Sequence, residues 1–245
     1  MRRVTRSALP APTAAALDQL QAHVNAAADP RAEAEARWQR KPAGPFAAVR
    51  TALDQMANGR ARCMYCEDSA GTDIEHFRPK SVYPARAFVW ENYLLACSFC
   101  NSNRKRSRFP LDATGAPLLI DPSDAQDDPI RHLELLPTSG RYRGRSPKGA
   151  TSVEVFDLNA EARPGRLPEG RRATLIKLQP LILDSDRCIS GGDEWGGHEL
   201  RRVILDEPFP AVRGYLLQIA AGPNAALLLR AGVSEAIDRH GMAAW

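Results

Sequence analysis

Two closely spaced cysteine pairs constrain this 245-residue chain more than any other feature of its sequence. The pairs are Cys63-x2-Cys66 and Cys97-x2-Cys100, and the fifth cysteine, Cys188, stands alone. A two-residue gap lets both thiolates of one turn point at the same ion, and two such turns complete a tetrahedral four-sulfur shell. Because four protein ligands leave no open coordination position, the spacing predicts a structural Zn²⁺ site rather than a catalytic one.

Two disulfides or plain buried thiols are the alternative interpretation of these cysteines. Near the N-terminus we find no basic start, apolar run and small-residue cleavage site, so a secretion signal is not expected. The longest apolar stretches, such as Ala225–Leu229, are far shorter than the roughly 20 residues of a membrane helix. We therefore expect a cytoplasmic protein with no membrane partner, in a reducing compartment that disfavours disulfides. Cys188 is expected to be structural.

Positive charge is concentrated in the first part of the chain. Residues 1–177 carry 27 basic and 20 acidic side chains, whereas residues 178–245 carry 6 and 9. The densest basic clusters lie at residues 104–108 and 141–148. Such local excess attracts polyanions, although a solvated surface rich in arginine shows the same pattern. Charge alone therefore leaves nucleic-acid binding open.

The apolar pattern predicts an α+β fold that is mostly helical around a small metal-bound centre. Residues 1–12 are basic and contain two prolines, which is typical of an extended arm. Between the cysteine pairs we expect a strand at residues 72–77, then an aromatic and aliphatic segment at residues 88–97, and a short basic helix after Cys100. The other expected elements are helices at residues 13–28, 30–40, 45–56, 173–183, 199–205, 211–221 and 224–239, a hairpin near Ser139-Gly140, and a loop rich in Pro, Gly and Arg at residues 163–172.

The segment around the cysteine pairs carries residues suited to phosphodiester hydrolysis. Glu75 and His76 are adjacent, Asn92 lies 16 residues beyond His76, and Asn101 directly follows Cys100. A neutral imidazole can take a proton from water near neutral pH. A carboxylate and an amide oxygen can hold a hard divalent cation that neutralises charge on a phosphate. Since neighbours on a strand normally point to opposite faces, a bend or bulge at Phe77 or Pro79 is needed to bring both side chains toward one phosphate.

Taken together, these residues resemble the zinc-bearing HNH nuclease motif over residues 60–110. The resemblance implies a zinc-bound ββα core, with His76 as the general base and Asn92 orienting the histidine loop through backbone hydrogen bonds. It also implies that Glu75, where Asp is commoner, and Asn101, at the third position of the motif, hold a catalytic Mg²⁺ or Mn²⁺. The cations expected to contact backbone phosphates are Arg78, Lys80, Arg104 and Lys105.

Several further sequence segments resemble a narrower group of HNH proteins. They are Met1-Arg2-Arg3, His76-Phe77-Arg78-Pro79-Lys80, Trp90-x-Asn92, Asn101-x3-Lys105, Leu119-Ile120-Asp121-Pro122, Asp128-Pro129 and His132-Leu133. These phrases are similar to the PtuB-like HNH effectors of Septu and retron-linked anti-phage systems, over roughly residues 1–160. The resemblance implies an ABC/SMC-like (PtuA-like) ATPase partner that restrains the nuclease until infection, and we expect the acidic C-terminal third to be its docking surface.

We therefore expect a metal-dependent HNH endonuclease that hydrolyses DNA as a defence effector. The expected division is an N-terminal arm with helices (1–60), the zinc-bound HNH motif (61–110) and a mostly helical C-terminal region (111–245). The alternative is a non-catalytic zinc-ribbon nucleic-acid-binding or adaptor protein, which explains the cysteines and basic clusters but not Glu75-His76 and Asn101. A third hypothesis is a purely structural partner of an ATPase, with a degenerate active site. The intact His and Asn positions disfavour it. Divalent-cation-dependent cleavage distinguishes the first two.

Overall fold

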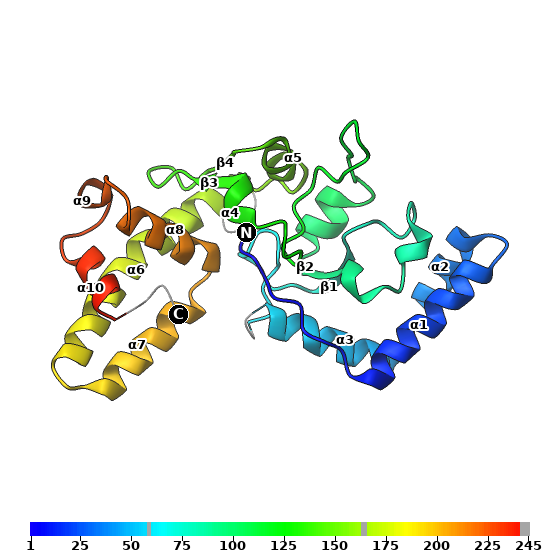
Figure 1. Ribbon diagram of the computed structural model, residues 1–245, viewed down its shortest axis with the longest axis horizontal. Coiled ribbons are helices and arrows are strands. Elements are labelled where there is room, and N and C mark those ends of the chain that lie inside the picture. Colours follow the sequence, from blue (N-terminus) through cyan, green and yellow to red (C-terminus); the bar gives the residue numbers. More distant parts are fainter. Residues whose placement is uncertain (58–59, 163–165, 241–245) are drawn as a thin grey trace.

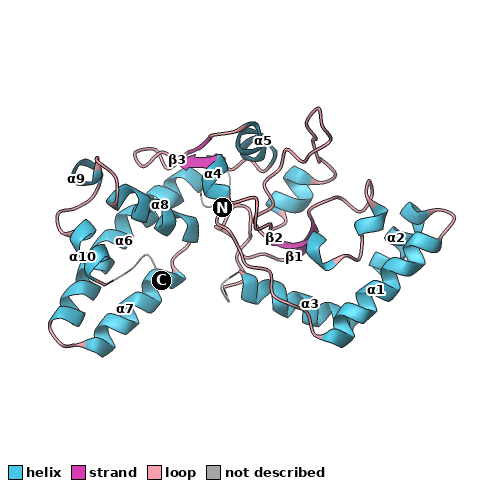
Figure 2. Cartoon of the chain, in the orientation of Figure 1, coloured by secondary structure: helices cyan, strands magenta, loops and turns pink. Residues whose placement is uncertain are grey.

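The fold is mostly helical, with two small antiparallel sheets between two groups of helices (Figures 1 and 2). The computed structural model describes residues 1–57, 60–162 and 166–240. Helices α1 to α3 lie at one end of the molecule and α6 to α10 at the other, with both sheets between them (Figure 1). The expected α+β class with a helical majority is therefore confirmed.

The first three helices match the expected ones to within two residues at each end. They are α1 (Ala11–Ala26), α2 (Pro30–Gln39) and α3 (Ala43–Met56). Asp29 caps α2, because its carboxylate accepts a hydrogen bond from the Ala32 amide at 3.0 Å. The buried face of α3 includes Phe46, Val49, Leu53 and Met56, which recur at helical spacing and pack into the core.

The arm that precedes α1 is extended, as expected, and it lies against the centre of the molecule. The Val4 amide donates to the Pro122 carbonyl at 2.8 Å. The Arg6 guanidinium donates to the carbonyls of Trp90 and Tyr93 at 2.9 and 3.0 Å. These bonds hold the arm beside the segment that joins the two strands of the first sheet.

The first sheet pairs β1 (Asp73–His76) with β2 (Tyr93–Ala96) in an antiparallel register that places His76 opposite Tyr93. Two short 3-10 helices, η1 (Pro84–Arg86) and η2 (Trp90–Asn92), lie between the strands. Of the aromatic and aliphatic segment at residues 88–97, only residues 93–96 therefore form a strand. After β2 comes η3 (Phe99–Lys105), a π-helix in place of the expected ordinary helix. Such wide turns are uncommon and occur often at functional sites.

The second sheet is the expected hairpin, formed by β3 (Leu133–Leu135) and β4 (Tyr142–Gly144). Gly140 in its turn has φ +68°, and a Cβ there would collide with the Pro168 carbonyl, so only glycine fits. Two helices beside the hairpin were not expected from the sequence: α4 (Pro129–His132) and α5 (Pro147–Val155).

The C-terminal helices differ from expectation in length and number. They are α6 (Leu167–Ser190), α7 (Glu194–Asp206), α8 (Pro210–Ala220), α9 (Ala225–Leu228) and α10 (Val233–Arg239). Helix α6 includes most of the segment expected to be a loop at 163–172, of which residues 163–165 lie outside the described residues. The single helix expected at 224–239 is wrong: it is divided before Gly232, which adopts φ +86°.

Buried contacts join the centre of the molecule to the C-terminal helices. The Tyr215 hydroxyl on α8 donates to the Leu133 carbonyl on β3 at 3.1 Å. Buried Arg171 on α6 donates to the Gly140 carbonyl at 2.8 Å. Within the described ranges, no helix has both the length and the apolar character that crossing a bilayer requires.

Candidate active site and metal centre

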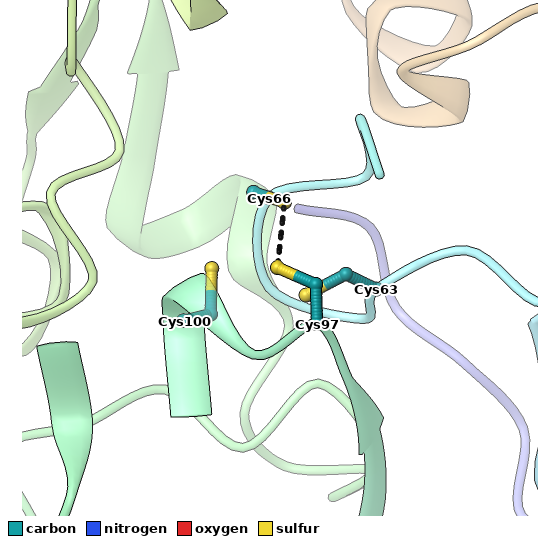
Figure 3. Close-up of side chains that lie close together, drawn as sticks. All are labelled: Cys63, Cys66, Cys97 and Cys100. Atoms are coloured by element: carbon teal, nitrogen blue, oxygen red, sulfur yellow. Dashed lines mark hydrogen bonds between the residues drawn. The ribbon is translucent and has the colours of Figure 1, made fainter. Parts of the chain in front are cut away.

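The four paired cysteines converge on one point in the interior. Their sulfur atoms all lie within 4.8 Å of one another, and all four residues are buried (Figure 3). Cys66 Sγ and Cys97 Sγ are 3.8 Å apart, far beyond the ~2.05 Å of a disulfide bond. A tetrahedral Zn²⁺ with bonds of about 2.3 Å separates its sulfur ligands by about 3.8 Å. The cluster therefore has the ligand type, number and spacing that could bind a structural Zn²⁺.

The local backbone positions each pair for this purpose. The first pair lies on a turn in which the Glu67 amide donates to the Cys63 carbonyl at 2.9 Å. The second pair follows β2, and the Asn101 amide donates to the Cys97 carbonyl at 3.0 Å. Cys188 lies apart on α6 and is partly exposed.

His76 ends β1 and is held in one tautomer by the backbone. Its Nε2 lies 2.9 Å from the Ala87 carbonyl, which can only accept, so Nε2 carries the proton and Nδ1 keeps its lone pair. Trp38 from α2 packs edge-on against the imidazole, with ring centroids 4.4 Å apart. Burial lowers the pKa of His76 to about 3, because the charged imidazolium loses its hydration. The ring is therefore neutral at physiological pH, as a base must be.

Glu75 is buried against Lys105, which lies one helical turn beyond Cys100. Glu75 Oε1 and Lys105 Nζ are 2.6 Å apart, and Nζ also donates to the His76 carbonyl at 2.8 Å. Burial raises the pKa of Glu75, and the nearby ammonium opposes that shift. Lys105 is fully buried, so the expectation that it contacts backbone phosphates is wrong for this conformation. A DNA strand therefore has no access to this ammonium in the present conformation.

Asn92 connects the two ends of the loop that separates β1 from β2. Its Oδ1 accepts from the Arg78 amide at 2.7 Å, and its Nδ2 donates to the carbonyls of Arg78 and Arg86 at 3.0 and 2.8 Å. The backbone adds a bond from the Phe77 amide to the Asn92 carbonyl at 2.9 Å. Asn92 thus fixes the chain directly after His76.

A pocket of about 250 Å³ brings three of the expected catalytic residues together. Glu75, His76 and Asn101 all line it, although Glu75 and His76 are neighbours on β1. Asn101 Nδ2 donates to Asp73 Oδ2 at 3.0 Å, which leaves its Oδ1 as the oxygen available to a ligand. Asn92 lies behind this pocket and lines a different one.

The four expected phosphate-binding cations lie in different environments. Lys80 lines the pocket and forms an ion pair with Glu35 at 2.7 Å. Arg78 instead packs over the Phe109 ring, with 5.1 Å between the guanidinium carbon and the ring centroid. Arg104 forms an ion pair with Asp157 at 2.6 Å. Lys80 is therefore the member of this set that the structure brings to the pocket.

Two other pocket residues were not selected from the sequence. Arg106 is exposed and lines the pocket, with φ +50° directly after η3. The basic residues around Arg106 indicate a charged surface, but the direction of its side chain depends on the π-helical turn of η3. Trp38 lies on α2, far from the motif in sequence, and a lone aromatic in a helix carries no signal of a site.

A comparison of the sequence with known proteins identifies a similar protein. No family model matches the chain. Septu protein PtuB from Bacillus thuringiensis is 32% identical to it over 116 residues. This chain resembles PtuB. The match covers 45% of the chain and 41% of PtuB, so the chain spans less than half the length of that relative. This match confirms the resemblance to PtuB-like proteins that was inferred from short sequence segments.

In this PtuB-like chain we expect His76 to stay neutral at unusually low pH. Its pKa of about 3 lies below the ~6.5 of an exposed histidine, so between these values the unfolded chain binds more protons. The contribution to stability is complete above pH 6.5 and is lost as the pH falls toward 3. An NMR titration of the imidazole without added Mg²⁺ measures the pKa, with the signal assigned by its absence in His76→Gln. Titration near pH 6.5 would contradict the prediction.

Proposed function

We propose that this chain is a metal-dependent HNH endonuclease that hydrolyses DNA phosphodiester bonds. One observation carries the proposal: Glu75, His76 and Asn101 line a single pocket directly beside a buried four-cysteine cluster. A zinc-ribbon adaptor requires the cysteines but has no need for a neutral histidine, a carboxylate and an amide around one space. The resemblance to PtuB supports the same assignment.

His76 is the proposed general base. With Nε2 donating to the Ala87 carbonyl, Nδ1 is the nitrogen that can take a proton from water. The water oxygen then attacks phosphorus, and the bond from phosphorus to the leaving oxygen breaks. Asn92 acts as a positioning residue, because its three hydrogen bonds fix the loop that begins after His76.

Glu75 and Asn101 are the residues that would hold a catalytic Mg²⁺ or Mn²⁺. They supply a carboxylate and an amide oxygen, the hard donors that these cations prefer. When bound, the cation supplies neutralisation of the charge on the phosphate and the leaving oxygen. Asp73 holds the Asn101 amide from the opposite side, which orients the oxygen of that amide.

Lys80 and Arg106 are the proposed contacts to the DNA backbone, because both line the pocket. Arg78 and Arg104 remain candidates for contacts outside it. Backbone contacts position a strand without reading bases, so weak sequence preference is expected.

The proposal extends to the setting of the enzyme through the resemblance to PtuB. We assign this chain the role of effector nuclease in a cytoplasmic anti-phage complex with an ABC/SMC-like ATPase. The division of the chain into residues 1–60, 61–110 and 111–245 is part of the same proposal. The C-terminal helices are the proposed docking region for the ATPase.

A cleavage assay on supercoiled plasmid tests the nuclease. Wild-type protein with Mg²⁺ or Mn²⁺ is expected to nick the plasmid, alone or with the ATPase, and His76→Ala is expected to lose this activity at least 100-fold. His23→Ala, which removes an exposed histidine on α1, is the matched control and should cleave like wild type. Zinc content and melting temperature are measured for each variant, so that loss of the fold is distinguished from loss of the base.

Absence of cleavage by the wild type with every cation and with the ATPase would contradict the nuclease and favour the adaptor. Full activity in His76→Ala would contradict the assignment of the base.

A further inference from the structure

We propose that a second pocket, formed by the N-terminal arm, α4 and α8, binds a phosphate group. It has a volume of about 270 Å³ and is lined by Arg2, Arg3 and Arg213. None of its lining residues belongs to the candidate active site. In Figure 1 the start of the arm lies beside α4 and α8, in the middle of the molecule.

Arg213 provides the main argument. It lies in the first turns of α8 and is mostly removed from water, and it forms no hydrogen bond or ion pair with any residue the structure describes. Burial lowers the pKa of Arg213, and the positive charges of Arg2 and Arg201 lower it further. A guanidinium brought out of water beside like charges is unfavourable unless an anion compensates it.

The acidic groups nearest the pocket are already engaged. Asp128 lines the pocket, but its Oδ1 accepts from the Ile130 amide at 3.2 Å and caps α4. Glu67, whose charge acts on Arg2, accepts from the Ala211 amide at 3.3 Å through Oε2. Arg2 donates weakly to the Met56 carbonyl at 3.5 Å, and Arg3 has no hydrogen bond or ion pair to any described residue. The lining of this pocket therefore contains three arginines and one carboxylate, that of Asp128.

Phosphate is the ligand that matches this arrangement. Guanidinium groups present paired N–H donors that fit phosphate oxygens, and several such groups can surround one tetrahedral anion. The first turn of α8 also lines the pocket, so the positive end of the helix dipole adds to the attraction. The phosphate belongs either to a nucleic-acid backbone or to a small polyphosphate, and both present the same oxygens.

Binding measurements without Mg²⁺ test the proposal independently of nuclease activity. The probes are inorganic triphosphate, followed by calorimetry, and a fluorescent single-stranded oligonucleotide, followed by anisotropy. Arg213→Gln is expected to weaken binding of at least one probe about tenfold, the effect of losing one charge-assisted contact. Arg230→Gln, which removes an exposed arginine from the loop after α9, is the matched control and should bind like wild type.

The same variants separate a ligand site from a structural role. An arginine that holds the fold together destabilises the protein when replaced, whereas Arg213→Gln removes an unpaired charge and should leave the melting temperature equal or higher. A tenfold loss for triphosphate alone identifies a small anion as the ligand, and a tenfold loss for the oligonucleotide identifies the nucleic-acid backbone. Equal binding by wild type and Arg213→Gln, or no binding by either, overturns the proposal.

Discussion

Replacing Cys97 with serine is expected to abolish zinc binding and cooperative folding of the central unit. Structural Zn²⁺ contributes about 10–16 kcal/mol in small zinc-bound units, as much as the roughly 5–15 kcal/mol that stabilises a whole domain. The turn that carries Cys97 leads from β2 into η3, so loss of the metal releases Asn101 and Lys105 together with the sulfur ligands. We expect zinc content to fall from about one ion per chain to near zero, with loss of the thermal unfolding transition.

Cys188→Ser provides the matched control for this experiment. Cys188 lies on α6, partly exposed and outside the cluster, so zinc content and melting temperature should match wild type. Elemental analysis measures the zinc, and circular dichroism follows unfolding. A soluble Cys97→Ser protein with an unchanged melting temperature would show that the cluster is four buried thiols without a structural ion.

The parts of the site that could be predicted from the sequence are those set by short-range spacing. Two residues between paired cysteines fix the direction of both thiols, so the cluster followed from the sequence. Asn92 immediately precedes β2, and Asn101 immediately follows Cys100, so both residues are attached to the elements that carry the second cysteine pair. Short-range spacing thus fixes where these residues lie along the backbone, whereas their roles in catalysis stay predictions.

The parts that could not be predicted depend on contacts between distant segments. Trp38 reaches His76 because α2 packs beside the loop between β1 and β2. Arg104 and Lys105 were both expected to contact phosphates, but the π-helical turn directs Lys105 inward and leaves Arg106 exposed. Likewise, Arg2 and Arg213 are 211 positions apart and meet only through tertiary packing. Local pattern contains no information about any of these pairings.

Lys105→Met is expected to lower the free energy of unfolding by about 3–5 kcal/mol, the typical penalty for leaving one member of a buried ion pair alone. Lys105 is 0% exposed, and Glu75 is buried with it. Methionine fills a similar volume, so the loss comes from the uncompensated Glu75 carboxylate and from the lost hydrogen bond to the His76 carbonyl. Urea unfolding of zinc-loaded protein at pH 7 measures the change.

Two further variants distinguish the charge from the packing. Arg104→Met removes the neighbouring exposed arginine, whose surface ion pair with Asp157 contributes about 0–1 kcal/mol. Glu75→Gln combined with Lys105→Met removes both charges and should recover most of the stability that Lys105→Met loses.

Because burial already raises the pKa of Glu75, its carboxylate becomes neutral in the single variant as the pH falls. The penalty should therefore shrink toward acidic pH, since a protonated Glu75 has no charge to compensate. If Lys105→Met is as stable as Arg104→Met at pH 7, the buried pair is not an essential support of the pocket. A penalty that disappears in the double variant instead assigns Lys105 to holding Glu75 ionised beside His76, where a divalent cation would need it.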